Sequence, residues 1–85
     1  MADNKFFNRL VVIISALRET TITTDRLDWF SNLFLEFKAI EQTLKHEDLQ
    51  EWQKNVLNNA REDFDEGSSF FNGKTITNPS LHYNN

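Results

Sequence analysis

The sequence predicts an all-α protein, a compact three-helix antiparallel bundle that ends in a C-terminal arm or small β-hairpin. Two observations indicate this class. Apolar residues recur at steps of three and four along three successive stretches, as they do on one face of a helix. Residues suited to capping a helix stand before these stretches: Asp3 or Asn4, Thr24 or Asp25, and Asp48. Because 85 residues suit one domain, we treat 1–85 as a single helical domain.

The first helix is expected over about residues 5–19, which hold the most apolar run of the chain. The run from Val11 to Ile14 has strand propensity, but the flanking residues extend the helical period on both sides. Because the apolar stripe covers most of the circumference, we expect this helix to be central and buried on several sides. Two further helices cover about two of those sides. The remaining side is left for Phe70 and Phe71 or for a second copy of the chain.

Residues 19–24 interrupt this period. Four threonines surround Ile22, and branched residues of this kind disfavour a helix, so we expect a loop with Ile22 turned inward. The second helix is expected over residues 25–45. Its apolar face holds Leu27, Phe30, Leu33, Phe34, Phe37, Ile40 and Leu44. Trp29 and Leu35 fall off that face.

The third helix is expected over residues 48–66. The segment from Asp48 to Glu51 resembles a capping box, which places the start of the helix there. No Gly or Pro separates it from the second helix, so one continuous helix remains an alternative. The expected apolar face holds Leu49, Trp52, Val56, Ala60 and Phe64, with Leu57 beside it. Gly67 is the expected C-terminal stop.

Residues 67–85 form the expected tail. The pair Asn72-Gly73 stands between short β-prone segments and is typical of a hairpin turn. The alternative is an irregular arm whose Phe70, Phe71 and Ile76 pack back on the helices.

Charge and composition argue against several classes of protein. The net charge is −4 and no cluster of Lys and Arg is present, which argues against direct nucleic-acid binding and against anionic membranes. The apolar run from Leu10 to Leu17 is far shorter than the ~20 residues that span a bilayer. No signal-peptide cleavage site follows it. We therefore expect a cytoplasmic protein that does not contact a membrane.

Residues that carry catalysis or bind metal ions are sparse. The chain has no Cys, and its two histidines, His46 and His82, lack the spacing of a zinc site. The segment from Asp63 to Gly67 departs from a calcium loop, because its glycine falls one position early. No nucleophile motif or phosphate loop surrounds the serines. We expect no metal, no cofactor and no enzyme, and an enzyme that uses carboxylates with His46 stands as the last alternative.

Acids and aromatic residues are the candidates for binding another protein. These candidate residues are Glu62, Asp63, Asp65, Glu66, Trp29, Phe70 and Phe71. The four acids fall in the last turn of the expected third helix, where the macrodipole disfavours negative charge. A docking patch for a basic surface would explain them, and so would a solvated helix end. The aromatic side chains are typical interface anchors, although packing beneath the tail explains them equally well.

From these residues we expect a small acidic, non-catalytic protein that binds another protein with a basic surface and inhibits or modulates it. We also expect a homodimer, formed through the first helix or the aromatic tail, because a chain of this size buries little surface alone. The alternative is a structural subunit or oligomerisation module of a larger complex, whose acids only keep it soluble.

Overall fold

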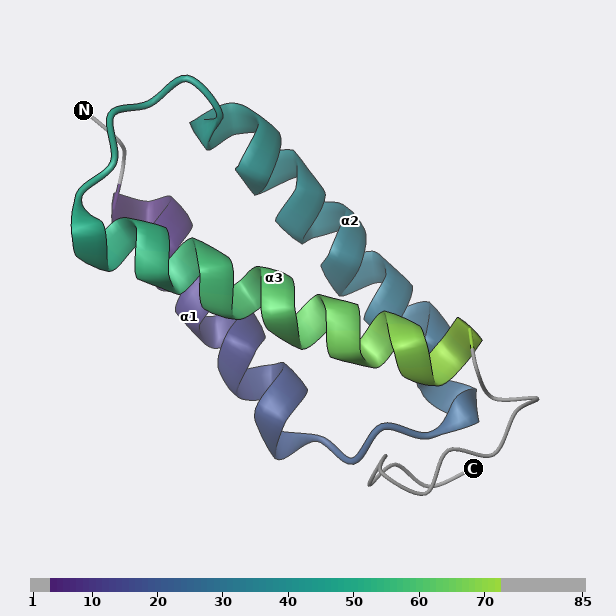
Figure 1. Cartoon of the computed structure of the whole chain (residues 1–85). Helices are drawn as coiled ribbons and strands as arrows, with labels where there is room; N and C mark the ends of the chain where they lie inside the picture. The colour runs from purple at the N-terminus through teal and green to yellow at the C-terminus, as the bar shows by residue number, and fades with distance from the viewer. Residues whose placement is uncertain (1–3, 73–85) are drawn as a thin grey trace.

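The computed structural model describes residues 4–72, and within them the chain forms three α-helices and no strand (Figure 1). The elements are α1 (Asn4–Glu19), a short 3₁₀ turn η1 (Thr24–Arg26), α2 (Leu27–Leu44) and α3 (Glu51–Asn72). Helix α2 runs back against the direction of α1, and α3 lies across both (Figure 1). The predicted all-α class is therefore confirmed. The predicted arm or hairpin is not, because residues 70–72 belong to α3 and residues 73–85 lie outside the described range.

The core is built from phenylalanine rings, and α3 joins the other two helices. The ring centroid of Phe64 on α3 lies 5.0 Å from that of Phe37 and 5.4 Å from that of Phe30, both on α2. Near the start of α3, Trp52 meets Phe7 of α1 edge-on, with the centroids 5.5 Å apart. All eight phenylalanines of the chain are buried or pack against the buried cluster. The phenylalanine rings therefore contribute to the core, whereas Trp52 remains 45% exposed.

Helix α1 is not the central helix that its composition predicts. Its buried stripe consists of Phe7, Leu10, Ile13 and Leu17. Val11 and Val12 remain 49% and 53% exposed. Each residue turns the helix by about 100°, so these two valines lie on its flank and back, beyond the reach of neighbours that cover one stripe. The tail aromatic Phe71 does not compensate for this, because it packs on Phe30 of α2, with ring centroids 5.1 Å apart.

The hydrogen bond that caps the start of α3 lies two residues later than the sequence pattern indicates. The backbone N–H of Gln50 donates to Gln53 Oε1 at 2.8 Å, and the Gln50 carbonyl accepts from the N–H of Lys54 at 3.0 Å. Gln53 is only 4% exposed, so the same bond satisfies a buried polar side chain. The predicted box from Asp48 to Glu51 is wrong. Residues 45–50 are not helical, which also rules out the continuous-helix alternative.

Gly67 lies inside α3 rather than at its end. The helix continues to Asn72, five residues beyond the predicted stop. The reason is the contact with α2, because a Cβ placed on Gly67 would lie 2.3 Å from Cε2 and 2.8 Å from Cζ of Phe30. The missing side chain lets the Phe30 ring lie against the backbone of α3. Here glycine permits a close approach of two helices and does not terminate one.

One ion pair joins each pair of helices. The pairs are Arg9 with Glu36 (α1 to α2), Arg18 with Asp63 (α1 to α3) and Arg61 with Glu41 (α3 to α2). Ion pairs near the surface contribute about 0–1 kcal/mol each, so they orient the helices more than they stabilise them. In residues 4–72, no buried side-chain nitrogen or oxygen lacks a hydrogen-bond partner.

Candidate functional site

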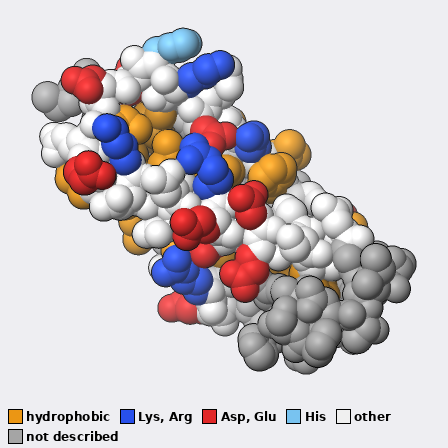
Figure 2. All heavy atoms as spheres, in the orientation of Figure 1, with side chains coloured by type: hydrophobic (Ala, Val, Ile, Leu, Met, Phe, Trp, Pro, Cys, Tyr) orange, Lys and Arg blue, Asp and Glu red, His pale blue; other side chains and the backbone are white. Residues whose placement is uncertain are grey.

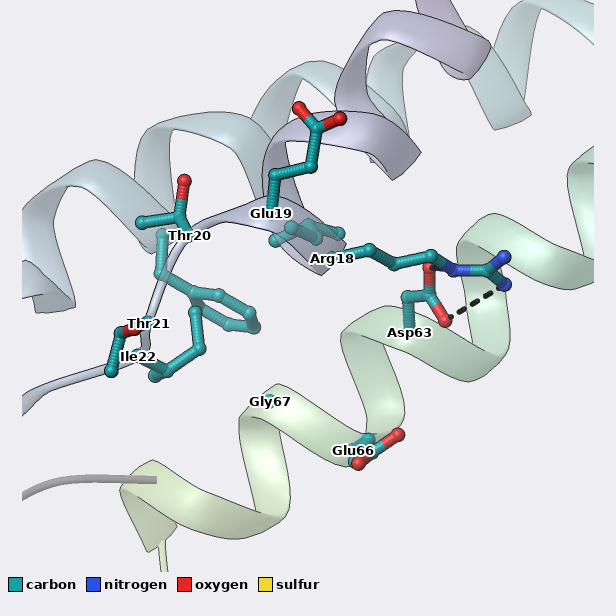
Figure 3. Close-up of a pocket in the computed structure, with 10 residues that line it drawn as sticks. Arg18, Glu19, Thr20, Thr21, Ile22, Asp63, Glu66 and Gly67 are labelled. Carbon is teal, nitrogen blue, oxygen red and sulfur yellow. Dashed lines mark hydrogen bonds and ion pairs between the residues drawn. The ribbon is translucent and has the colours of Figure 1, made fainter. Parts of the chain in front are cut away.

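A cavity of about 370 Å³ opens where the end of α1, the loop that follows it and the second half of α3 meet (Figure 3). We call it the α1–α3 groove. It contains an apolar floor, an arginine and two of the four predicted acids, Asp63 and Glu66. These features come from three separate segments of the chain, so the groove exists only in the folded protein.

The floor of the groove is apolar and buried. Leu17, Ile22 and Phe30 line it and are 8%, 2% and 5% exposed. The burial of Ile22 confirms that the threonine-rich loop turns this residue inward. Gly67 also lines the groove and is itself buried.

Arg18 reaches from α1 to Asp63 on α3 (Figure 3). Its Nε donates to Oδ2 at 2.8 Å and its Nη2 donates to Oδ1 at 3.3 Å. These bonds and the charge of Asp63 raise the pKa of the Arg18 guanidinium, and the charges of Glu62 and Glu66 raise it further. One arginine is therefore surrounded by three carboxylates of the predicted cluster.

The structure brings three of the four predicted acids to one flank of α3. Glu62 and Asp63 are adjacent and precede Glu66 by four and three residues, and all three face the side of α1. Asp65 lies about 160° round the helix from Asp63, on the other flank. Because α3 continues to Asn72, none of the four lies in its last turn. The predicted conflict with the macrodipole is therefore wrong, since that effect fades beyond one turn.

The three predicted aromatic residues differ in how accessible they are. Phe70 is 3% exposed and belongs to the interior. Phe71 is half-buried against Phe30, one of the floor residues of the groove. Trp29 is also half-buried, and the guanidinium of Arg26 lies 6.0 Å from its ring centroid. Phe71 and Trp29 thus keep part of their surface accessible, and Phe70 keeps almost none.

Arg18 and Gly67 are groove residues whose roles the sequence pattern does not reveal. Arg18 pairs with an acid 45 positions later in the chain, and no local spacing predicts such a pair. Gly67 carries one usable signal, because it continues the buried series of Ala60 and Phe64 at steps of four and three. A small residue on a buried helix stripe indicates that another element approaches closely.

A second cavity, of about 630 Å³, lies between the end of α2 and α3. Its charged side chains are Lys45, Lys54 and Arg61 with Glu41, Glu47 and Asp48. Figure 2 shows a similar mixture of blue and red side chains across the face turned to the viewer. Neither sign dominates this cavity, so it offers no preference for a charged ligand.

Among residues 4–72, no group of three or more His, Asp or Glu side chains could hold a metal ion. None of the helices in that range is long and apolar enough to cross a membrane. His82 lies outside the described residues.

Comparisons of the chain with protein-family models, with curated proteins and with solved structures find no match. The function is therefore inferred from the chemistry of the groove and of the exposed helix faces.

Proposed function

We propose that this protein acts without catalysis, by binding a basic segment of another protein in the α1–α3 groove. The observation that supports this most directly is the pairing of an apolar floor with carboxylates at its edge. Lysine and arginine side chains have a long apolar stem and a charged head, and they bury the stem while the head stays solvated. In the groove the stem lies on Phe30 and Ile22 while the head meets Glu66.

The acidic flank of α3 supplies the attraction. Glu62 and Glu66 are exposed and one turn apart, and neither takes part in an ion pair within residues 4–72. Like charges at this spacing repel each other by a few tenths of a kcal/mol, which a cation of the partner would relieve. Asp63 is different, because Arg18 already holds its carboxylate. The partner's cation therefore binds to Glu62 and Glu66.

The other predicted contact residues extend this surface. Phe71 continues the apolar floor from Phe30 towards the end of α3, and Phe70 supports it with ring centroids 5.0 Å apart. Of the remaining predicted contact residues, Trp29 and Asp65 do not line the groove. Covering a basic segment prevents it from binding any other anion, which is how the protein inhibits or modulates its partner.

Capture from cell extract at low and high salt tests the proposal. The variant Glu62→Gln/Glu66→Gln removes one charge that lines the groove and a second one turn away on the same flank of α3. Glu47→Gln/Glu51→Gln removes two exposed glutamates elsewhere as the matched control. We expect the wild type and the control to capture the same protein in a salt-sensitive manner, and the groove variant to lose it. Circular dichroism verifies that all three chains are folded. Equal, salt-dependent capture by both variants would overturn the proposal.

A structural subunit or oligomerisation module is the second candidate. The observation that favours it is the exposure of Val11 and Val12, at 49% and 53%, on α1. In that case the acids only keep the assembly soluble. Native mass spectrometry with and without cell extract separates the two candidates. A stoichiometric foreign partner supports the binding protein, and self-assembly alone supports the subunit.

A further inference from the structure

The C-terminal end of α1 borders the α1–α3 groove with backbone carbonyls that have no hydrogen-bond donor. The last four carbonyls of an α-helix lack a partner within the helix. In α1, the carbonyl of Ala16 accepts from the N–H of Thr20 at 3.1 Å. The carbonyls of Leu17, Arg18 and Glu19 accept no hydrogen bond from residues 4–72. All three of these residues line the groove.

None of the usual devices closes this end of α1. A glycine with positive φ often satisfies the last carbonyls of a helix, but no residue within 4–72 has a positive φ. Arg18 is the basic residue of the last turn, and its guanidinium extends to Asp63 on α3. Leu17 is only 8% exposed, and carbonyls of buried residues are normally paired. The end of α1 therefore calls for a donor that residues 4–72 do not supply.

Helix α3 brings a carboxylate to the same place. The pairs Phe7–Trp52 and Arg18–Asp63 are both separated by 45 positions in the chain, so α1 and α3 run in the same direction and α1 ends beside Asp63. Glu66 lies about one turn further along α3 and borders the groove from the side opposite the end of α1 (Figure 3). The end of a helix carries partial negative charge. Two negative groups thus face one cavity, and both favour a cation.

A guanidinium matches these acceptors better than an ammonium does. It carries five N–H donors in one plane, whereas an ammonium carries three. It is also more weakly hydrated and packs on aromatic rings, so it loses less when it enters a groove floored by Phe30. The cavity of about 370 Å³ is at the lower end of the roughly 300–1,000 Å³ of ligand pockets, which suits one long side chain.

We propose that the α1–α3 groove recognises an arginine of the partner, whose guanidinium donates both to the free carbonyls at the end of α1 and to the carboxylate of Glu66. This inference rests on the proposed function, because it names the residue type in the basic segment that the groove binds. Charge and hydrogen-bond donors then contribute separately. The carboxylate attracts any cation, whereas the carbonyls select the cation with more donors. No side-chain substitution removes a backbone carbonyl, so the test varies the ligand.

NMR titrations with four capped amino acids measure the two contributions. The probes are the N-acetyl amides of arginine, asymmetric dimethylarginine, lysine and citrulline. Dimethylation keeps the positive charge and blocks N–H donors, whereas citrulline keeps donors and has no charge. We expect the arginine probe to shift the amide signals of residues 17–22 and of Gly67, which line the groove. It should bind about tenfold more tightly than the dimethylarginine and lysine probes, and the citrulline probe should bind most weakly.

The variant Glu66→Gln separates the charge from the donors. Glu51→Gln is the matched control, because Glu51 is an exposed glutamate of α3 that does not line the groove. We expect E66Q to weaken the arginine, dimethylarginine and lysine probes by similar factors and to preserve the preference for arginine. E51Q should change neither the affinities nor the preference. Unshifted signals outside the site of substitution verify that both variants are folded.

The outcomes distinguish this inference from the proposed function. Equal affinities of the arginine and dimethylarginine probes at the groove would overturn the inference and leave the proposed function standing, because charge alone would then explain the binding. A preference for the lysine probe would have the same meaning. If none of the four probes shifts the groove signals at millimolar concentration, the inference is also refuted, and the capture experiment with Glu62→Gln/Glu66→Gln decides the proposed function by itself.

Discussion

The substitution Gly67→Ala tests whether the contact of Gly67 with Phe30 sets how closely α2 and α3 approach. At an exposed helix position, exchanging glycine for alanine stabilises a protein by about 1 kcal/mol, because glycine has a low helix propensity. At Gly67 the new Cβ would lie 2.3 Å from Cε2 and 2.8 Å from Cζ of Phe30. Carbon atoms do not approach so closely, so the ring or one of the helices has to move.

The ring of Phe30 has little room to move. It is 5% exposed, and its centroid lies 5.4 Å from that of Phe64 and 5.1 Å from that of Phe71. Overpacking a filled core costs about 1–3 kcal/mol. After subtracting about 1 kcal/mol for the gain in helix propensity, we expect Gly67→Ala to destabilise the protein by about 1 kcal/mol. For a domain of this size, that loss lowers Tm by about 4–8 °C.

Urea and thermal unfolding followed by far-UV circular dichroism measure the effect. Phe30→Leu is the matching background, since leucine lacks the ring atoms that the new Cβ would meet. In that background Gly67→Ala should become stabilising, by up to about 1 kcal/mol. We therefore expect the effect of Gly67→Ala on the free energy of unfolding to change sign between the native chain and the Phe30→Leu background. If Gly67→Ala stabilises the native chain as it would at an exposed position, the contact does not limit the approach of the helices.

Two further changes test the start of α3 and the ion pair between α2 and α3. Gln53→Ala leaves the Gln50 N–H without its acceptor and should lower the free energy of unfolding, measured in urea, by about 1 kcal/mol. Gln50→Ala keeps the backbone N–H and its hydrogen bond to Gln53, so it should lower the free energy of unfolding by less. Burial acts to raise the pKa of Glu41, but hydrogen bonds from Lys38 and Arg61 outweigh it and the pKa is lowered. A carboxylate of this kind adds stability above its ordinary pKa of 4.5 and loses it as the pH falls through the lowered value. Thermal unfolding across this range should therefore show Glu41→Gln less stable than the wild type at neutral pH and less affected by acid.

The helices and most of the core follow from the spacing of apolar residues. The buried residues of α2 are Phe30, Phe37, Ile40 and Leu44, and all four belong to the predicted face. The start of α3 differs, because Trp52 is 45% exposed while Gln53 is buried. From hydropathy alone, a tryptophan is expected to be buried in preference to a glutamine. Gln53 is buried nevertheless, because its side-chain oxygen accepts a hydrogen bond from the Gln50 N–H.

The groove could be predicted only in part, because it depends on contacts between distant segments. Clustering in the sequence predicts the acidic group, but the predicted position of these acids relative to the helix end is wrong, because glycine more often ends a helix than lies inside one. Only the neighbouring ring of Phe30 shows that this glycine serves a close approach. The same holds for Arg18, whose partner Asp63 becomes a neighbour only when α1 and α3 pack.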